Sequence, residues 1–302
     1  MTTAADCQAL GRHLKRTTVL VVGDLMLDRY YWGEVRRVSP EAPVPIVKVN
    51  EKTYSLGGSG NVAANLSGLG CRVALVGLIG QDAAGERLNG LLADYGIAHH
   101  GIDDTGRATI TKTRVMAGKQ QVVRLDEEDG RPIDDATAER ILSVIHDRIP
   151  SVQAVVLSDY GKGMFHAAAF VQAIIQACAK EAIPVFIDPK GADWQRYAGA
   201  TCITPNTVEL ELAAGARISD EAGLTPRAQV LRRRLSLQWL LVTRGPRGMA
   251  LFGDDPAPMM IAARTREVFD VSGAGDTVIA ALAACVAAGL SFVEAAGVAN
   301  IA

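Results

Sequence analysis

The sequence of 302 residues lacks the features that assign a chain to a specialised class of protein. Aromatic residues make up only 5%, the charges nearly balance (31 Lys and Arg against 33 Asp and Glu), and the longest apolar run, residues 278–290, is short and rich in alanine. The short run argues against a membrane span, and the balanced charge argues against a nucleic-acid binder, which needs a basic surface. Residues 1–18 are charged and contain no apolar segment, so we expect no secretory signal.

Cysteine is scarce and scattered. The five cysteines are odd in number and never form a CxxC pair; they are Cys7, Cys71, Cys178, Cys202 and Cys285. This pattern argues against a disulfide framework and against a zinc site, and it predicts a reduced, cytoplasmic location. The hydrophobic fraction of 49% excludes disorder and is sufficient for a sizeable core.

Several catalytic signatures are also missing. The chain has no GxxxxGK[ST], GxSxG or HExxH motif, and its five histidines have no metal-ligand spacing. These absences argue against a P-loop nucleotide hydrolase, a serine hydrolase of the GxSxG type and a zinc protease.

The regular part of the sequence alternates short apolar runs with longer helical periods. Strands are predicted at residues 18–22, 72–78, 154–158, 184–187, 202–204 and 240–242. Helices are predicted at residues 61–69, 86–95, 133–148, 167–180 and 226–235. The alternation predicts a three-layer α/β fold in which helices cover both faces of a mostly parallel sheet.

Two segments interrupt the alternation. Residues 30–38 and 44–52 form one pair of strand-like runs, and residues 108–116 and 121–126 form a second pair around a hairpin turn. Neither pair has a helix between its strands, so we expect a small antiparallel sheet inserted at about residues 29–52 and 107–126. A lid over a site is the interpretation we favour; a dimer surface and ordinary surface hairpins are the alternatives.

The strongest chemical motif is residues 270–277, Asp-Val-Ser-Gly-Ala-Gly-Asp-Thr, directly before an apolar helix. Gly273, Ala274 and Gly275 leave backbone N–H groups bare at the positive end of a helix, which makes an anion hole. Asp276 beside it can accept the proton of an attacking hydroxyl, as phosphoryl transfer requires. The alternative is an ordinary glycine-rich helix start capped by aspartate.

A second glycine-rich segment also opens a helix. Gly57 and Gly58 allow a close backbone approach to a ligand, and Asn61 offers a donor and an acceptor. The segment fits a dinucleotide fingerprint only weakly, because it does not follow the first strand of a βαβ unit. That first strand instead ends at Asp24, a carboxylate placed where open α/β sheets bind ligands and able to accept sugar hydroxyls.

Further polar residues follow the later strands. Asn206 and Glu209 lie three apart at a helix start, where they either form a capping box or order Mg²⁺-bound waters and phosphates. Lys190 after one strand is a candidate phosphate contact, although it is equally explained as a solvated loop lysine. The strand before residue 243 ends in a glycine-rich turn, and its candidate nucleotide contacts are Thr243, Gly245 and Gly248.

Together these elements resemble the ribokinase-like, or PfkB, carbohydrate kinases over nearly the whole chain. The segment from Gly57 to Asn61 is similar to the family's N-terminal signature, and residues 270–277 are similar to its C-terminal signature, which contains the catalytic aspartate. Asn206 and Glu209 match the family's NxxE motif. The resemblance implies a ribokinase-like fold and ATP as phosphoryl donor, with Mg²⁺ held by Glu209 through water. It also implies a homodimer formed through the lid sheet.

Within the family, residues 23–30, 37–49, 123–126 and 157–163 are most similar to bacterial kinases that phosphorylate O1 of D-glycero-β-D-manno-heptose 7-phosphate for lipopolysaccharide-core biosynthesis. The resemblance implies a stand-alone kinase whose final helix stops early, so that part of the adenine pocket is expected to be missing. A phosphosugar needs cations at the sugar end of the site. The candidate cations are Lys112, Arg114 and Arg124 on the suspected lid and Lys162 after a strand. Asp159 is a further candidate for contacting the sugar.

Three other functions remain open from the sequence. A different sugar or sugar-phosphate kinase of the same fold is the nearest alternative. A non-catalytic sugar-binding module is disfavoured because a binder needs no base beside an anion hole. A dinucleotide-dependent oxidoreductase is disfavoured by the misplaced fingerprint.

Overall fold

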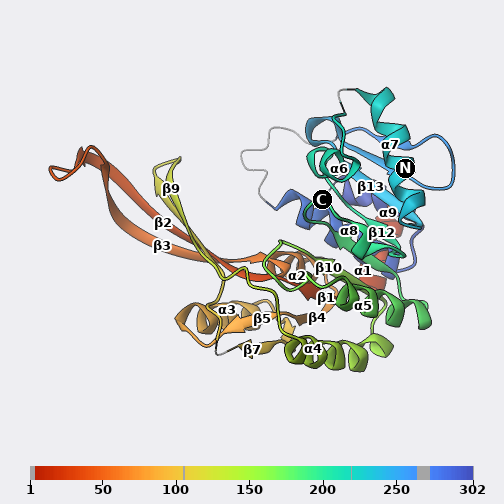
Figure 1. The fold of residues 1–302 in the computed structure, drawn as a ribbon, viewed down its shortest axis with the longest axis horizontal. Helices are drawn as coiled ribbons and strands as arrows, with labels where there is room; N and C mark the ends of the chain where they lie inside the picture. Colours follow the sequence, from red (N-terminus) through yellow and green to blue (C-terminus); the bar gives the residue numbers. More distant parts are fainter. Residues whose placement is uncertain (1–3, 105, 219, 264–272, 302) are drawn as a thin grey trace.

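The computed structural model describes residues 4–104, 106–218, 220–263 and 273–301. Within these residues, nine strands form the main sheet in the order β15-β14-β13-β12-β11-β10-β1-β4-β6 (Figure 1). All neighbours from β13 to β6 are parallel, while β14 and β15 form an antiparallel edge. The strands are β1 (Thr18–Gly23), β4 (Arg72–Val76), β6 (Ala98–His99), β10 (Ala154–Ser158), β11 (Val185–Asp188), β12 (Cys202–Ile203), β13 (Trp239–Thr243), β14 (Met249–Phe252) and β15 (Met259–Ile261).

Helices cover both faces of this sheet, as the alternation predicted. Successive residues of a strand point to opposite faces, so Leu20 and Val22 of β1 join one apolar cluster and Val19 and Val21 join the other. The first cluster includes side chains of α4 (Asp135–Arg148), α5 (Ala168–Lys180), α6 (Thr207–Ala214) and α7 (Glu221–Arg234). The second includes side chains of α1 (Ala4–Leu14), α2 (Ser59–Gly68), α3 (Ala83–Asp94), α8 (Ala274–Ala287) and α9 (Phe292–Ala299).

The inserted segments form a separate sheet of four strands in the order β3-β2-β8-β9, called the lid sheet below. Its strands are β2 (Leu25–Val38), β3 (Pro45–Gly58), β8 (Thr111–Ala117) and β9 (Gln120–Glu127). The two predicted hairpins are present, but β2 and β8 join them in parallel, so the expectation of a purely antiparallel sheet was wrong. In Figure 1 the β2–β3 hairpin extends far from the body of the molecule.

The predicted strand at residues 72–78 is two strands. β4 ends at Val76, and β5 (Leu78–Gly80) pairs with β7 (Ile102–Asp104) in a small sheet of its own. Gly77 lies at the break, where an added Cβ atom would be only 2.7 Å from the Gly23 carbonyl oxygen. The chain turns there because only glycine permits this close approach.

The carboxyl ends of β1, β10, β11, β12 and β13 meet at one edge of the sheet because these strands are adjacent and parallel. The first turns of α2 and α8 meet at the same edge, since Asn61 of α2 donates a hydrogen bond to Asp276 of α8. Open α/β sheets bind ligands at this edge. No helix in the described part of the chain has the length and apolar character that a bilayer span requires.

Candidate active site

A cleft of about 640 Å³ lies at the carboxyl edge of the sheet, and it is large enough for a nucleotide. Every residue predicted for the anion hole, the base and the nucleotide side lines this cleft: Lys190, Asn206, Glu209, Thr243, Gly245, Gly248, Gly273, Ala274, Gly275 and Asp276. Of the predicted sugar contacts, Asp159 lines it as well. Residues 270–272 of the motif lie outside the described residues.

The anion-hole motif opens α8. Gly273 is the N-cap with a left-handed φ of 82°, and an added Cβ there would lie 2.7 Å from the Asn61 amide nitrogen, so only glycine fits. Ala274, Gly275 and Asp276 follow as the first residues of the helix. Their N–H groups have no partner within the helix and lie at its positive end, which suits an anion.

Asp276 is 4% exposed and is held by two hydrogen bonds. Asn61 Nδ2 donates to one carboxylate oxygen and the Tyr160 hydroxyl to the other, each at 2.7 Å. Burial raises the pKa of Asp276, while both hydrogen bonds oppose the rise. The carboxylate is therefore oriented and is a stronger base than an exposed aspartate.

Two titratable side chains that line the cleft, those of Tyr160 and Asp188, were not predicted from the sequence. Tyr160 follows β10, and a single tyrosine after a strand forms no motif that could have identified it. Asp188 ends β11, and the pKa of its carboxyl is raised well above the usual value by burial and by the neighbouring carboxylates of Asp276 and Glu209. The position of Asp188 at a strand's carboxyl end was the available signal, and it is the same signal that singled out Asp24.

The Asn206–Glu209 pair forms the capping box of α6. Asn206 Oδ1 accepts from the Glu209 backbone N–H at 3.0 Å, and Glu209 Oε2 accepts from the Asn206 N–H at 2.9 Å. The remaining Glu209 oxygen faces the Lys190 ammonium at 3.8 Å. The capping reading is confirmed, and both side chains still line the cleft.

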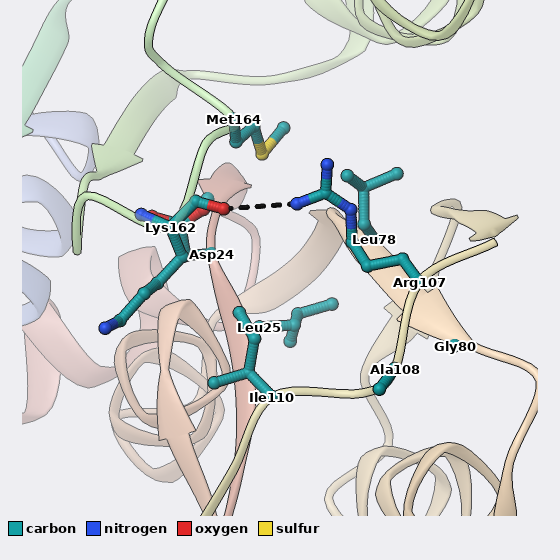
Figure 2. Close-up of a pocket in the computed structure, with 10 residues that line it drawn as sticks. Asp24, Leu25, Leu78, Gly80, Arg107, Ala108, Ile110, Lys162 and Met164 are labelled. Atoms are coloured by element: carbon teal, nitrogen blue, oxygen red, sulfur yellow. Dashed lines mark hydrogen bonds between the residues drawn. The ribbon is translucent and has the colours of Figure 1, made fainter. Parts of the chain in front are cut away.

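Asp24 lies beneath the loop that follows β10. It is 4% exposed, and its Oδ2 accepts from the backbone N–H groups of Tyr160 at 2.9 Å and Lys162 at 3.1 Å. The adjoining cavity of about 10 Å³ has room for about one water molecule; Figure 2 shows it between Asp24, Arg107 and Met164. Asp24 therefore supports the loop that presents Tyr160, and its contact with a sugar hydroxyl stays a prediction.

Asp159 is likewise committed to protein partners. Its Oδ2 accepts from the Tyr197 hydroxyl at 2.5 Å and from Arg196 at 2.9 Å, and its Oδ1 accepts from the Gly161 N–H. These contacts fix the same loop, so Asp159 and Asp24 both build the support under Tyr160.

The close approach at Gly57 and Gly58 is to the chain itself. An added Cβ at Gly57 would lie 2.8 Å from Asp28 Oδ2, and one at Gly58, where φ is 56°, would lie 2.4 Å from the Asp24 carbonyl oxygen. The glycines therefore let the end of β3 pack against the start of β2. Asp28, which the sequence left unplaced, lies close enough to Asp276 for its charge to raise the pKa of Asp276.

The four predicted sugar-side cations gather around the lid sheet and the β10 loop. Three have carboxylate partners: Arg114 with Asp28 at 2.6 Å, Arg124 with Asp126 at 2.8 Å, and Lys162 with Glu128 at 2.5 Å. The fourth, Lys112, places its ammonium 5.6 Å from the centre of the Tyr160 ring.

Comparison with known proteins identifies the family of the chain. The family model for pfkB family carbohydrate kinases matches residues 16–302. The chain belongs to the pfkB family of carbohydrate kinases. These enzymes are phosphotransferases that use ATP.

The pfkB relatives in curated collections include longer proteins. Bifunctional protein HldE of Desulfatibacillum aliphaticivorans is 44% identical over 94% of this chain and 58% of its own length. Bifunctional protein HldE of Alkalilimnicola ehrlichii is 49% identical over the same shares. The chain therefore spans well under two thirds of the length of these relatives.

Solved structures confirm the ribokinase-like fold. A candidate ribokinase from Agrobacterium tumefaciens has a TM-score of 0.75 at 19% identity, covering 95% of this chain and 89% of that one. The tetrameric inhibited form of phosphofructokinase-2 from Escherichia coli has a TM-score of 0.75 at 18% identity, covering 92% and 90%.

Proposed function

We propose that this chain transfers the γ-phosphoryl group of ATP to O1 of D-glycero-β-D-manno-heptose 7-phosphate, a step of ADP-heptose and lipopolysaccharide-core biosynthesis. The observation that carries the kinase assignment is the buried Asp276 carboxylate at the start of α8, oriented by Asn61 and Tyr160 beside a nucleotide-sized cleft. Homology to the kinase part of HldE supports the substrate. Another pfkB-type sugar or sugar-phosphate kinase is the alternative.

In the proposed mechanism, Asp276 accepts the proton of the anomeric hydroxyl as its oxygen bonds to the γ-phosphorus. The bond between that phosphorus and the bridging oxygen breaks, and ADP leaves. Backbone N–H groups from Gly273 to Asp276 hold the charge on the transferring group, so positioning and electrostatics supply most of the acceleration. Each Asp276 oxygen accepts one protein hydrogen bond and keeps a lone pair for the sugar.

Mg²⁺ fits the phosphate side of the cleft. The described residues hold no cluster of three or more His, Cys, Asp or Glu side chains able to bind a metal. Mg²⁺ typically takes one or two carboxylates, with waters and substrate phosphates completing its shell. Asp188 and Glu209 supply such carboxylates, and burial together with the like charges of Asp276 and Glu209 raises the pKa of Asp188. When bound, the ion would neutralise charge on the phosphates.

Glu209→Gln separates the metal role from the capping role. Glutamine also serves as the third residue of a capping box, so the variant should keep its thermal stability. If Glu209 orders Mg²⁺ through water, the Mg²⁺ concentration for half-maximal rate should rise severalfold. If Glu209 is only a cap, both the thermal stability and the metal dependence should stay unchanged.

A matched control lies in α9. Ser291 and Glu294 form a second capping box outside the cleft. Glu294→Gln should reproduce any capping effect on the melting temperature and leave the Mg²⁺ titration unchanged. An unchanged Mg²⁺ titration in Glu209→Gln would remove Glu209 from the metal site.

The cations around the lid sheet are proposed to bind the phosphate of the sugar. Arginine suits this role because its planar fork binds two phosphate oxygens. We expect Arg114→Ala or Arg124→Ala to weaken use of heptose 7-phosphate at least tenfold, about 1.4 kcal/mol, with ATP affinity unchanged. Steady-state kinetics with each substrate varied in turn measures both effects.

Arg36→Ala is the control for these variants, since Arg36 lies on the same sheet, is exposed, and pairs only locally with Glu34 among the described residues. If Arg114→Ala and Arg124→Ala both match Arg36→Ala, these two arginines do not bind the phosphate of the sugar.

We further propose that the chain is one kinase domain and that it acts in the cytoplasm. We also propose that it dimerises through the lid sheet. The side of that sheet away from the cleft carries exposed apolar residues, among them Val49, Val123 and Leu125. A second copy would bury them. Sedimentation equilibrium showing only monomer at micromolar concentration would contradict the dimer.

Phosphorus NMR of the reaction with ATP and heptose 7-phosphate tests the proposed reaction itself. A new anomeric phosphate signal should grow in step with ADP while the 7-phosphate signal persists. A product phosphorylated at another position, or no sugar product, would contradict the assignment.

A further inference from the structure

The side of the lid sheet that faces the cleft carries its charges in rows across the strands. Side chains in register on neighbouring strands point to the same side. One row consists of Asp28, Lys112 and Asp126, and the next of Tyr30, Arg114 and Arg124. Lys112 lies over the ring of Tyr160, which lines the cleft, so this side looks into the site.

Lys112 lacks the carboxylate partner that each of the other three cations of the site has within the described residues. Arg114, Arg124 and Lys162 each have a carboxylate within 2.9 Å. Lys112 forms no ion pair within the described part of the chain, and its one close partner is the Tyr160 ring. Half-burial and the nearby Lys162 lower its pKa, while the carboxylates of Asp28 and Asp126 on the neighbouring strands oppose the fall without forming an ion pair with it. A dianion can bind Lys112 without first displacing a carboxylate.

Tyr160 connects this lysine to the catalytic carboxylate. Its ring lies under the Lys112 ammonium, and its hydroxyl donates to Asp276 at 2.7 Å. Its backbone N–H is held by Asp24 at 2.9 Å. Tyr160 is therefore anchored at its backbone and at its hydroxyl, and the Lys112 ammonium lies over its ring.

We propose that Lys112 binds the phosphate of the sugar substrate and that Tyr160 is a positioning residue through which this contact aligns Asp276, so that the phosphate accelerates turnover as well as binding. The inference rests on the proposed function and deepens it. A phosphate on the outer side of Lys112 fixes the ammonium over the ring, and the fixed ring holds the hydroxyl against the Asp276 oxygen. Binding energy from a non-reacting group is then used at the reacting centre.

The test supplies the phosphate separately from the sugar. Turnover of unphosphorylated heptose with ATP is measured with and without inorganic phosphite, a small dianion that cannot itself accept the phosphoryl group as the sugar does. We expect saturating phosphite to raise the wild-type rate at least about tenfold. Lys112→Ala should abolish this activation and raise KM for heptose 7-phosphate.

Tyr160→Phe distinguishes positioning from mere support of the fold. Loss of the hydroxyl should lower kcat for heptose 7-phosphate about tenfold and change KM by no more than about twofold. Phosphite should still bind to this variant but should no longer raise its rate. Lys52→Ala is the matched control, because Lys52 stacks on Tyr31 at 4.9 Å in the same sheet but on its other side. It should keep the phosphite activation.

The inference is overturned if phosphite leaves wild-type turnover of heptose unchanged while heptose 7-phosphate is used well. It is also overturned if Lys112→Ala retains the activation, or if Tyr160→Phe changes KM alone. A wild-type protein that does not phosphorylate heptose 7-phosphate at all would instead overturn the proposed function, and this inference with it.

Discussion

Asp276→Asn should lower kcat by roughly 10²–10⁴-fold, which is the typical contribution of a positioned general base. Asparagine has nearly the same shape but cannot take the proton of the sugar hydroxyl. Its side-chain oxygen can still accept from Asn61, and its amide can donate to the Tyr160 oxygen, because a hydroxyl both donates and accepts. The site should therefore keep its geometry and its affinity for ATP and sugar.

The measurement is kcat for the variant, with ATP binding and the melting temperature measured in parallel. Because burial raises the pKa of Asp276, the wild-type rate should fall as pH drops through that raised pKa, and the variant should lose this acidic limb. A folded Asp276→Asn protein with near-normal turnover would exclude the proposed mechanism.

Asp24→Asn should change the pH dependence of stability by about 2.4 kcal/mol between pH 4 and pH 7. Burial raises the pKa of Asp24 from 3.8 to about 6, with the like charge of Asp159 adding to the rise and the N–H groups of Tyr160 and Lys162 opposing it. Between these two pKa values the folded protein holds a proton that the unfolded chain has lost. Stability from this group is therefore complete below pH 3.8 and is lost as pH rises through about 6.

Asparagine carries no charge at any of these pH values, and its oxygen can replace Oδ2 as the acceptor for the two N–H groups. Urea unfolding of both proteins from pH 4 to pH 7 should show the wild type losing stability relative to Asp24→Asn as pH rises. Asp134→Asn is a control with the opposite expected sign. Hydrogen bonds from Thr137 lower the pKa of Asp134, so the ionised form stabilises the fold and the wild type should gain stability relative to Asp134→Asn as pH rises. Parallel pH curves for the wild type and Asp24→Asn would show that the buried carboxyl does not titrate in this range.

The layers of the fold were predictable because they follow from local periodicity. The alternation of apolar runs along Val19 to Val22 places residues on both faces of the sheet, and the helical periods supply the covering layers. Pairing between distant segments was not predictable. Leu27 pairs with Thr111 in the parallel contact of β2 and β8, and no local pattern records which hairpin edges meet.

The site divides in the same way. Asp276, Gly273 and the Asn206–Glu209 box were found because each belongs to a short motif whose physical role is local to a helix start. Tyr160 was missed because its function depends on a hydrogen bond across 116 residues. Asp24 was predicted as a site residue because it follows a strand, and the structure places it there. Its Oδ2 accepts hydrogen bonds from the backbone N–H groups of Tyr160 and Lys162, and the sequence did not indicate the path of that loop.

We expect this pfkB kinase to prefer a phosphorylated heptose to other sugars, and ADP release measured with different sugars tests that preference. Initial rates with ATP are compared for heptose 7-phosphate, unphosphorylated heptose, ribose and no sugar. The value of kcat/KM for heptose 7-phosphate should exceed that for either other sugar by at least about tenfold, and little ADP should form without sugar. Equal use of ribose or unphosphorylated heptose would contradict it and leave a sugar kinase of unassigned substrate.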